Sequence, residues 1–213
     1  MTLRRFFTIA PLCIAVATGQ AISRTKPTPP VHAARTAREK PVFKGVRNTS
    51  YEVEGQRVLR HEGIVDASLK QVWITCTTAD GMRTYLAPVV EFELKTGGKY
   101  DTNYRPGSRI GDAGTIHNEV LAYLPRKMLS FRVGLTDRFP AGPRQAGTLF
   151  AVLQFEGISD HKTKVTISMA GWGSGPDWDQ VYEFFDRGNA YTLAALQHRF
   201  VNGPVKWKAS ERN

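Results

Sequence analysis

One long helical pattern, at the C-terminal end of a series of short strands, constrains this 213-residue chain more than any other feature. Residues 177–201 carry apolar side chains at three- and four-residue spacing, which is typical of an amphipathic helix, and Asn202, Gly203 and Pro204 end it. An antiparallel sheet needs a cover for its apolar face, and only this helix is large enough to provide one. The sequence therefore predicts an α+β helix-grip fold, in which a curved antiparallel sheet of about six to seven strands wraps around a long C-terminal helix.

The strands are indicated by alternating apolar and polar residues and by the turns between them. In VVEFEL, residues 89–94, apolar residues alternate with glutamates, and Gly97-Gly98 is typical of a hairpin turn. Two short helices are predicted after the first strand, over residues 68–76 and 79–88, and residues 139–147 are predicted to form a loop. The predicted strands cover residues 57–67, 89–94, 99–105, 115–123, 128–135, 148–157 and 164–171.

The N-terminal residues have the three-part layout of a secretory signal peptide. Arg4-Arg5 precedes an apolar run that is too short to span a bilayer of ~30 Å, and small residues follow it. We therefore expect residues 1–21 to be a signal peptide, and the mature chain to be exported, periplasmic or secreted, without a transmembrane span. Residues 22–50 contain four prolines, many cations and few large apolar residues, which predicts a disordered linker. The domain is predicted over residues 51–207, with a tail over 208–213.

The charge distribution argues against nucleic-acid binding. The formal net charge is +10, but residues 1–60 hold 11 Lys/Arg and 3 Asp/Glu and account for +8 of it. The predicted domain is therefore nearly neutral, and it lacks the concentrated basic surface that nucleic acid requires. Of the two cysteines, Cys13 lies in the predicted signal peptide, and Cys76 has apolar neighbours that predict a buried, unreactive side chain.

The glycine-rich stretch GWGSGPDWDQVYEFF, residues 171–185, fits none of the motifs that use glycines to bind phosphate or to carry a nucleophile. Trp172 and Pro176 stand where a nucleophile elbow centred on Ser174 requires glycines, and a P-loop Gly-Lys-Ser/Thr is absent. Aspartates in the first helical turn favour the positive end of the helix dipole and would repel a phosphate. The stretch is predicted to be a structural joint, with Ser174 or Gly175 as the helix cap.

Two residues interrupt the apolar stripe of the long helix, Gly188 and Asn189. A glycine costs ~1 kcal/mol relative to alanine in a helix interior. Two explanations are open: the glycine permits a close approach of the helix to the sheet, or it leaves room for a ligand.

His117 and Glu119 share a face if their strand is regular, and Arg132 on the next strand is placed to pair with them. On the solvent face this set would be an ordinary cross-strand pair, whereas inside the fold it would anchor the polar head of a ligand. A metal site needs a further ligand and supporting hydrogen bonds, so we expect no metal and no other cofactor. We also find no catalytic residues: neither paired carboxylates at an informative spacing nor a Ser/His/Asp arrangement is present.

Several segments together are similar to a known family. LRHEGIVDASLKQVWITCTTADGMRTYLAP, the Gly97-Gly98 turn, VLAYLPRKMLSFRV and GWGSGPDWDQVYEFFDRG resemble the START-like (SRPBCC) superfamily. Within it, they resemble the AHSA1-like group, named for the activator of Hsp90 ATPase homologue. The resemblance covers about residues 57–207 and implies the helix-grip fold, although the superfamily includes lipid carriers, cyclases, hormone receptors and a co-chaperone. The predicted export signal departs from the usual members of the group.

A curved sheet that grips one helix leaves a cleft in which a small ligand can lie. We therefore expect the domain to bind a small apolar or amphipathic ligand without chemistry. Two alternatives are an interaction module that stimulates an Hsp90-type ATPase, as the family name implies, and a cyclase- or hydrolase-like enzyme that uses His117, Glu119 or Arg132. The residues predicted to line the cavity are Trp73, Tyr85, Tyr104, His117, Arg132, Trp172, Trp178, Tyr182 and Phe185.

Overall fold

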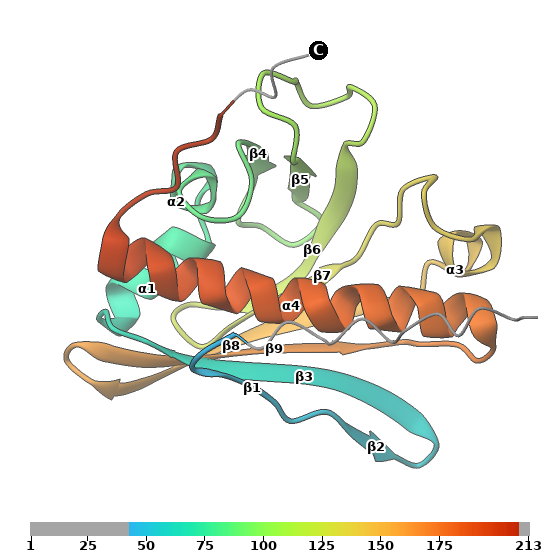
Figure 1. The fold of residues 1–213 in the computed structure, drawn as a ribbon, viewed down its shortest axis with the longest axis horizontal. Helices are drawn as coiled ribbons and strands as arrows, with labels where there is room; N and C mark the ends of the chain where they lie inside the picture. Colours follow the sequence, from blue (N-terminus) through green and yellow to red (C-terminus); the bar gives the residue numbers. More distant parts are fainter. Residues whose placement is uncertain (1–42, 209–213) are drawn as a thin grey trace, which may run out of the picture. The chain divides into compact units, whose positions relative to one another are not determined.

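The computed structural model describes residues 43–208, which form one antiparallel sheet, a long helix and three short helices (Figure 1). The strands are β1 (Val46–Asn48), β2 (Tyr51–Val53), β3 (Gln56–Val65), β4 (Val89–Phe92), β5 (Lys99–Asn103), β6 (Ile116–Leu124), β7 (Met128–Arg132), β8 (Phe150–Ser159) and β9 (Lys162–Ala170). The helices are α1 (Leu69–Cys76), α2 (Ala79–Arg83), α3 (Ala141–Ala146) and α4 (Pro176–Asn202).

The sheet has the order β1-β3-β9-β8-β7-β6-β5-β4, with β2 paired to β3, and every pairing within residues 43–208 is antiparallel. Figure 1 shows α4 lying lengthwise along β3, and Val181 of α4 packs with Ala151 of β8 and Met169 of β9, which confirms the predicted helix-grip fold. The sheet has nine strands because short β1 and β2 add to those predicted. Helix α3 lies within the segment predicted to be a loop, since its six residues are too few for a periodic pattern.

Alternation along the long strands gives the sheet its apolar inner face. In the antiparallel register, Leu59 of β3 lies opposite Met169 of β9, and Met169 lies opposite Ala151 of β8. All three side chains are buried. Leu153 and Ile167 form the next such pair along the same strands. This buried face is the one that α4 covers.

The glycine-rich stretch before α4 is the structural joint that its sequence predicts. Gly175 is the N-cap residue, with a positive φ of 99°, and Pro176 occupies the first helical turn together with Asp177. A side chain at Gly173 could not be accommodated, because a Cβ there would lie 2.3 Å from the indole nitrogen of Trp178. The indole of Trp178 therefore packs directly onto the backbone of the joint, and this contact sets the direction in which α4 leaves the sheet.

Two apolar clusters form the core, one beneath each end of α4. Under the C-terminal part, Leu193 and Leu196 pack with α1, α2 and the sheet. Under the N-terminal part, Val181 packs with Trp172 and Phe139. The helix of 27 residues is about 40 Å long, so each cluster covers only part of its length. The middle of α4 is the segment that the two clusters leave between them.

Strand β1 belongs to the sheet although it lies within residues 22–50, which were predicted to be a disordered linker. Val46 and Asn48 pair with Gly63 and His61 of β3, so the ordered domain begins before residue 51. The prediction is wrong here because three residues are too few for alternation to be visible. The predicted signal peptide and most of the predicted linker lie outside the described residues.

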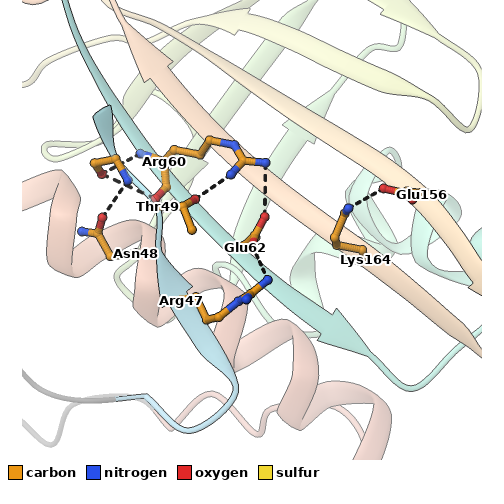
Figure 2. A network of polar contacts seen from close by, with 8 residues as sticks. Arg47, Asn48, Thr49, Arg60, Glu62, Glu156 and Lys164 are labelled. Carbon is orange, nitrogen blue, oxygen red and sulfur yellow. Dashed lines mark hydrogen bonds and ion pairs between the residues drawn. The ribbon is translucent and has the colours of Figure 1, made fainter. Parts of the chain in front are cut away.

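Polar side chains fasten β1 and the turn after it to β3 (Figure 2). Glu62 of β3 is only 7% exposed, accepts a hydrogen bond from Arg47 of β1, and pairs with Arg60 at 3.2 Å. Arg60 in turn donates a hydrogen bond of 2.6 Å to Thr49 Oγ1. Because one nearly buried carboxylate binds two arginines, β1 is joined to β3 by side chains as well as by the backbone pairing of the strands.

Candidate functional site

A cavity of about 570 Å³ lies between the middle of α4 and the sheet. Successive strands line it with residues two positions apart, as expected for side chains on one face of a strand. Its contacts with the sheet include Tyr100 and Thr102 of β5, Ala151 and Leu153 of β8, and Ile167 and Met169 of β9. Several of these residues also belong to the two core clusters, so the cavity is the hollow that separates them.

Helix α4 contributes the opposite wall through residues between Phe184 and Thr192. A Cβ built on Gly188 would meet no other atom within 4 Å. Of the two explanations for this glycine, the structure therefore excludes close packing against the sheet: Gly188 borders open space and lines the cavity. The interruption of the apolar stripe marks the site.

Two asparagines line the cavity, with different hydrogen bonds. Asn118 of β6 donates to the carbonyl oxygen of Tyr100 at 2.9 Å and accepts from the backbone nitrogen of Gly134 at 3.0 Å. Asn189 of α4 is 8% exposed, and its buried Nδ2 has no hydrogen-bond acceptor within residues 43–208. The first asparagine is used by the fold, whereas the amide nitrogen of the second is inaccessible to solvent and has no partner among the described residues.

Two of the residues that line the cavity, Tyr85 and Tyr100, are buried tyrosines. Burial raises the pKa of Tyr85 and that of Tyr100 well above the usual value for a phenol. Tyr85 Oη lies 3.5 Å from Cys76 Sγ, and burial raises the pKa of Cys76 to about 12. Both tyrosines therefore stay protonated at neutral pH, and Cys76 is a buried thiol rather than a thiolate nucleophile, as the sequence indicates.

The exposed lining residues mark the mouth of the cavity. Tyr104, Phe184 and Tyr191 are 48%, 38% and 58% exposed, and Arg138 and Arg187 are also exposed. These two arginines are the only charged side chains among the described lining residues, which include no carboxylate, histidine, lysine or cysteine. Residues 43–208 contain no group of three or more His, Cys, Asp or Glu side chains arranged to hold a metal ion.

Three of the nine residues predicted to line a cavity do so: Tyr85, Tyr104 and Phe185. Tyr85 follows α2, Tyr104 follows β5 at the mouth, and Phe185 lies on α4. The ring of Phe185 stacks on that of Phe139 with their centroids 6.2 Å apart. The three correctly predicted residues thus include one on α4 and two outside it.

Four predicted aromatic residues pack elsewhere in the domain. Trp73 belongs to the cluster under the C-terminal part of α4 and makes an edge contact with Phe155 at 5.4 Å. Trp172 is buried in the other cluster, and its Nε1 donates to the carbonyl oxygen of Met169 at 3.1 Å. Trp178 packs on Gly173, and Tyr182 packs on Trp172. These large rings pack in the two core clusters under the ends of α4 and do not line the cavity.

His117 and Arg132 do not line the cavity either. The side chain of His117 is 65% exposed and pairs with Asp101 at 3.1 Å beside a second, smaller hollow of about 320 Å³. Arg132 pairs with Glu119 at 3.5 Å, and both side chains are about half exposed. The structure therefore supports the first explanation, that His117, Glu119 and Arg132 form cross-strand pairs on the solvent face. It does not support an enzyme that uses these side chains within the cavity.

A buried polar cluster under α4 has no signal in the sequence. Asp186 accepts a hydrogen bond of 2.7 Å from Asn48 Nδ2, and its Oδ1 lies 3.2 Å from His61 Nε2. His61 and Asp186 are 2% and 5% exposed. The cluster joins β1, β3 and α4, three elements far apart in the sequence, so no local spacing could reveal it. It does not line the cavity and holds one side of the helix to the sheet.

The comparisons with known proteins support the same fold. Among solved structures, the chain is similar to protein MLL2253 from Mesorhizobium loti, with 18% identity, a TM-score of 0.55, and coverage of 70% of this chain and 100% of that one. It is also similar to the Aha1 dimer from Colwellia psychrerythraea, with 16% identity, a TM-score of 0.55, and coverage of 68% and 97%. CalU16 from Micromonospora echinospora is a third, with 16% identity, a TM-score of 0.52, and coverage of 76% and 86%.

At these identities the solved structures bear on the fold alone. Curated proteins give no match to the sequence. Across residues 43–208, no helix combines the length and the apolar character needed to cross a membrane.

A family model described as "Activator of Hsp90 ATPase homolog 1-like protein" matches residues 66–200, which is more than half of the chain. The chain therefore belongs to the family of activator of Hsp90 ATPase homolog 1-like proteins.

Proposed function

We propose that this domain binds a small amphipathic molecule in the cavity between α4 and the sheet, and that it does so without catalysing a reaction. The observation that carries the proposal is the cavity itself, which has a volume of about 570 Å³. This volume lies within the range of small-molecule sites, ~300–1,000 Å³. Burial of a ligand's apolar surface against the wall would contribute about 25 cal/mol per Å².

The polar groups of the cavity support binding rather than chemistry. General acid–base and nucleophilic catalysis need a titratable or nucleophilic side chain at the reacting atoms. The described lining residues offer neutral tyrosines, amides and threonines, and their only charged members are arginines at the mouth. Such a wall can orient a ligand by hydrogen bonds but has no base to accept a proton.

Asn189 supports a ligand that carries an oxygen acceptor. A buried donor without a partner costs about 1–3 kcal/mol. Asn189 Nδ2 is such a donor within the described residues, and the residue lines the cavity. Because this nitrogen is inaccessible to solvent, the Asn189 side chain has to turn toward the cavity before a carbonyl, ether or hydroxyl oxygen of the ligand accepts its hydrogen bond.

Gly188 offers a direct test, because a side chain there would enter the cavity without meeting another atom within 4 Å of its Cβ. Gly188→Phe should fill the cavity and abolish ligand binding, and Gly188→Ala is the matched control that should retain it. Binding is measured by native mass spectrometry of protein purified from its own source, with thermal midpoints to verify folding. If the wild-type protein carries no bound small molecule, or if the folded Gly188→Phe variant carries as much as the control, the proposal is wrong.

We also propose that the chain is exported, from the basic start, apolar run and small residues at its N-terminus. Cell fractionation should find a shortened chain outside the cytoplasm. Ala15→Asp, which places a charge in the apolar run, should retain the full-length chain inside. A full-length wild-type chain in the cytoplasm would contradict export.

The family match favours a second candidate, a protein-interaction module that stimulates an Hsp90-type ATPase. This role would use the surface rather than the cavity, so stimulation should be equal for the wild type and Gly188→Phe. It is measured as ATP turnover of a purified Hsp90-type chaperone with and without the domain. Unchanged turnover at saturating domain concentration would exclude it.

A further inference from the structure

The two arginines at the mouth identify the kind of head group that the cavity accepts. Arg138 and Arg187 both line the cavity and are both exposed, whereas none of the described lining residues is acidic. The charge of the site is therefore positive and is concentrated at its entrance. A cavity with low-dielectric walls and charge of one sign attracts ligands of the opposite sign.

Arg138 lies in the segment between β7 and α3 and Arg187 lies on α4, but the two arginines are at the same part of the rim. The guanidinium carbon of Arg138 lies 5.8 Å from the centre of the Phe184 ring and 5.9 Å from that of Phe139. Phe184 precedes Arg187 on α4 by three positions, and residues at that spacing are neighbours on a helix surface. The rings of Phe139 and Phe184 thus hold the Arg138 guanidinium group beside the face of α4 that carries Arg187.

Neither arginine is neutralised by a neighbour in the described part of the chain. Asp137 is adjacent to Arg138 in the sequence, and Glu183 lies one helical turn before Arg187, yet the ion pairs within residues 43–208 include neither arginine. The hydrogen bond that Arg138 makes there runs from Nε to Thr136 Oγ1 at 3.3 Å. Guanidinium groups bind carboxylate, sulfate and phosphate oxygens in pairs of parallel hydrogen bonds.

We infer that the ligand is an anionic amphiphile. Its oxyanion head pairs with Arg138 and Arg187 at the mouth, and its apolar part lies along the floor formed by Ala151, Leu153, Ile167 and Met169. This inference rests on the proposed function and adds the charge of the ligand to it. A neutral head would leave both exposed guanidinium groups to water and gain nothing from their charge, and a cationic head would be repelled.

The test compares three probes with the same apolar chain: decanoate, decanol and decyltrimethylammonium. Isothermal titration calorimetry of the wild-type protein should give a dissociation constant for decanoate about tenfold or more below that for decanol, which corresponds to one charge-assisted hydrogen bond. Decyltrimethylammonium should bind more weakly than decanol. Added salt should weaken decanoate binding and leave decanol binding unchanged.

Variants assign the preference to the two arginines. Arg138→Gln/Arg187→Gln should bind decanoate and decanol equally and keep the wild-type affinity for decanol. Arg126→Gln/Arg132→Gln removes the same charge from exposed positions that do not line the cavity and should keep the preference. Equal binding of decanoate and decanol by the wild-type protein, or a preference that survives in the first double variant, would overturn the inference and leave the proposed function standing. Failure of all three probes to bind would overturn both.

Discussion

Asn118 and Asn189 are the same residue type on opposite walls of one cavity, and they differ in what their amides bind. Asn118 bridges two backbone groups of neighbouring segments, so its amide is part of the sheet. The Nδ2 atom of Asn189 has no acceptor within residues 43–208. The two amides therefore contribute differently to the free energy of unfolding.

This difference predicts opposite effects of one substitution. Asn189→Leu, which is close in volume, should raise the free energy of unfolding of the ligand-free protein by about 1 kcal/mol, because it removes an unsatisfied donor. Asn118→Leu should lower it by about 1–3 kcal/mol, because it takes a hydrogen-bond partner from the partly buried carbonyl of Tyr100 and N–H of Gly134. Urea unfolding of both variants measures this. A loss of stability in Asn189→Leu would show that the fold itself uses that amide.

Elements are positioned by contacts at their ends, and the start of α4 gives a clear case. Gly173→Ala should lower the free energy of unfolding by about 1–3 kcal/mol, because the new methyl group would overlap the Trp178 indole. Gly188→Ala in the same helix should raise it by up to ~1 kcal/mol, because it meets open space and improves helix propensity. Thermal unfolding compares the two, and equal effects would contradict the tight contact between Gly173 and Trp178.

Strand β1 depends on Glu62. Glu62→Gln should lower the free energy of unfolding by about 1–3 kcal/mol, since the carboxylate is nearly buried and holds Arg47 and Arg60. Glu156→Gln removes an exposed carboxylate that pairs with Lys164 in the same view of Figure 2 and should leave the unfolding midpoint unchanged. Hydrogen exchange should show faster exchange in β1 for the first variant only. Equal exchange in both would mean that β1 is held by its backbone alone.

The long helix and the seven longer strands of this fold could be predicted from the sequence, but β1, β2, α3 and most of the cavity could not. Alternation and turn residues locate strands such as β4 and β8 because each is a local pattern with period two. The sequence of the two predicted short helices assigns Trp73 and Tyr85 alike to the interior, and it contains nothing that distinguishes a packed interior from a hollow one. Trp172 and Trp178 fill the core, whereas the hollow lies where Gly188 and Asn189 interrupt the stripe of α4. The interruption was visible in the sequence, but its meaning depended on the strands opposite.

The molecule as a whole should lose stability at alkaline pH. Burial raises the pKa of Cys76 from 9.0 to about 12 and raises those of Tyr85 and Tyr100 above 10.0. Above those ordinary values the unfolded chain releases protons that the folded chain retains, so unfolding becomes more favourable as the pH rises. The urea midpoint should therefore fall from about pH 9 towards pH 12, and tyrosinate absorbance should rise with unfolding. A constant midpoint over this interval would contradict burial of these groups.

The hollow between the two clusters also bears on how such a molecule changes over evolutionary time. Leu193 and Val181 secure the ends of α4, whereas Gly188, Asn189, Arg138 and Arg187 face the hollow and belong to neither cluster. Mutations at the second set can alter which molecule is accommodated while the first set preserves the architecture. If the domain binds a ligand as proposed, the residues of the wall can therefore change its ligand one position at a time while the fold is retained.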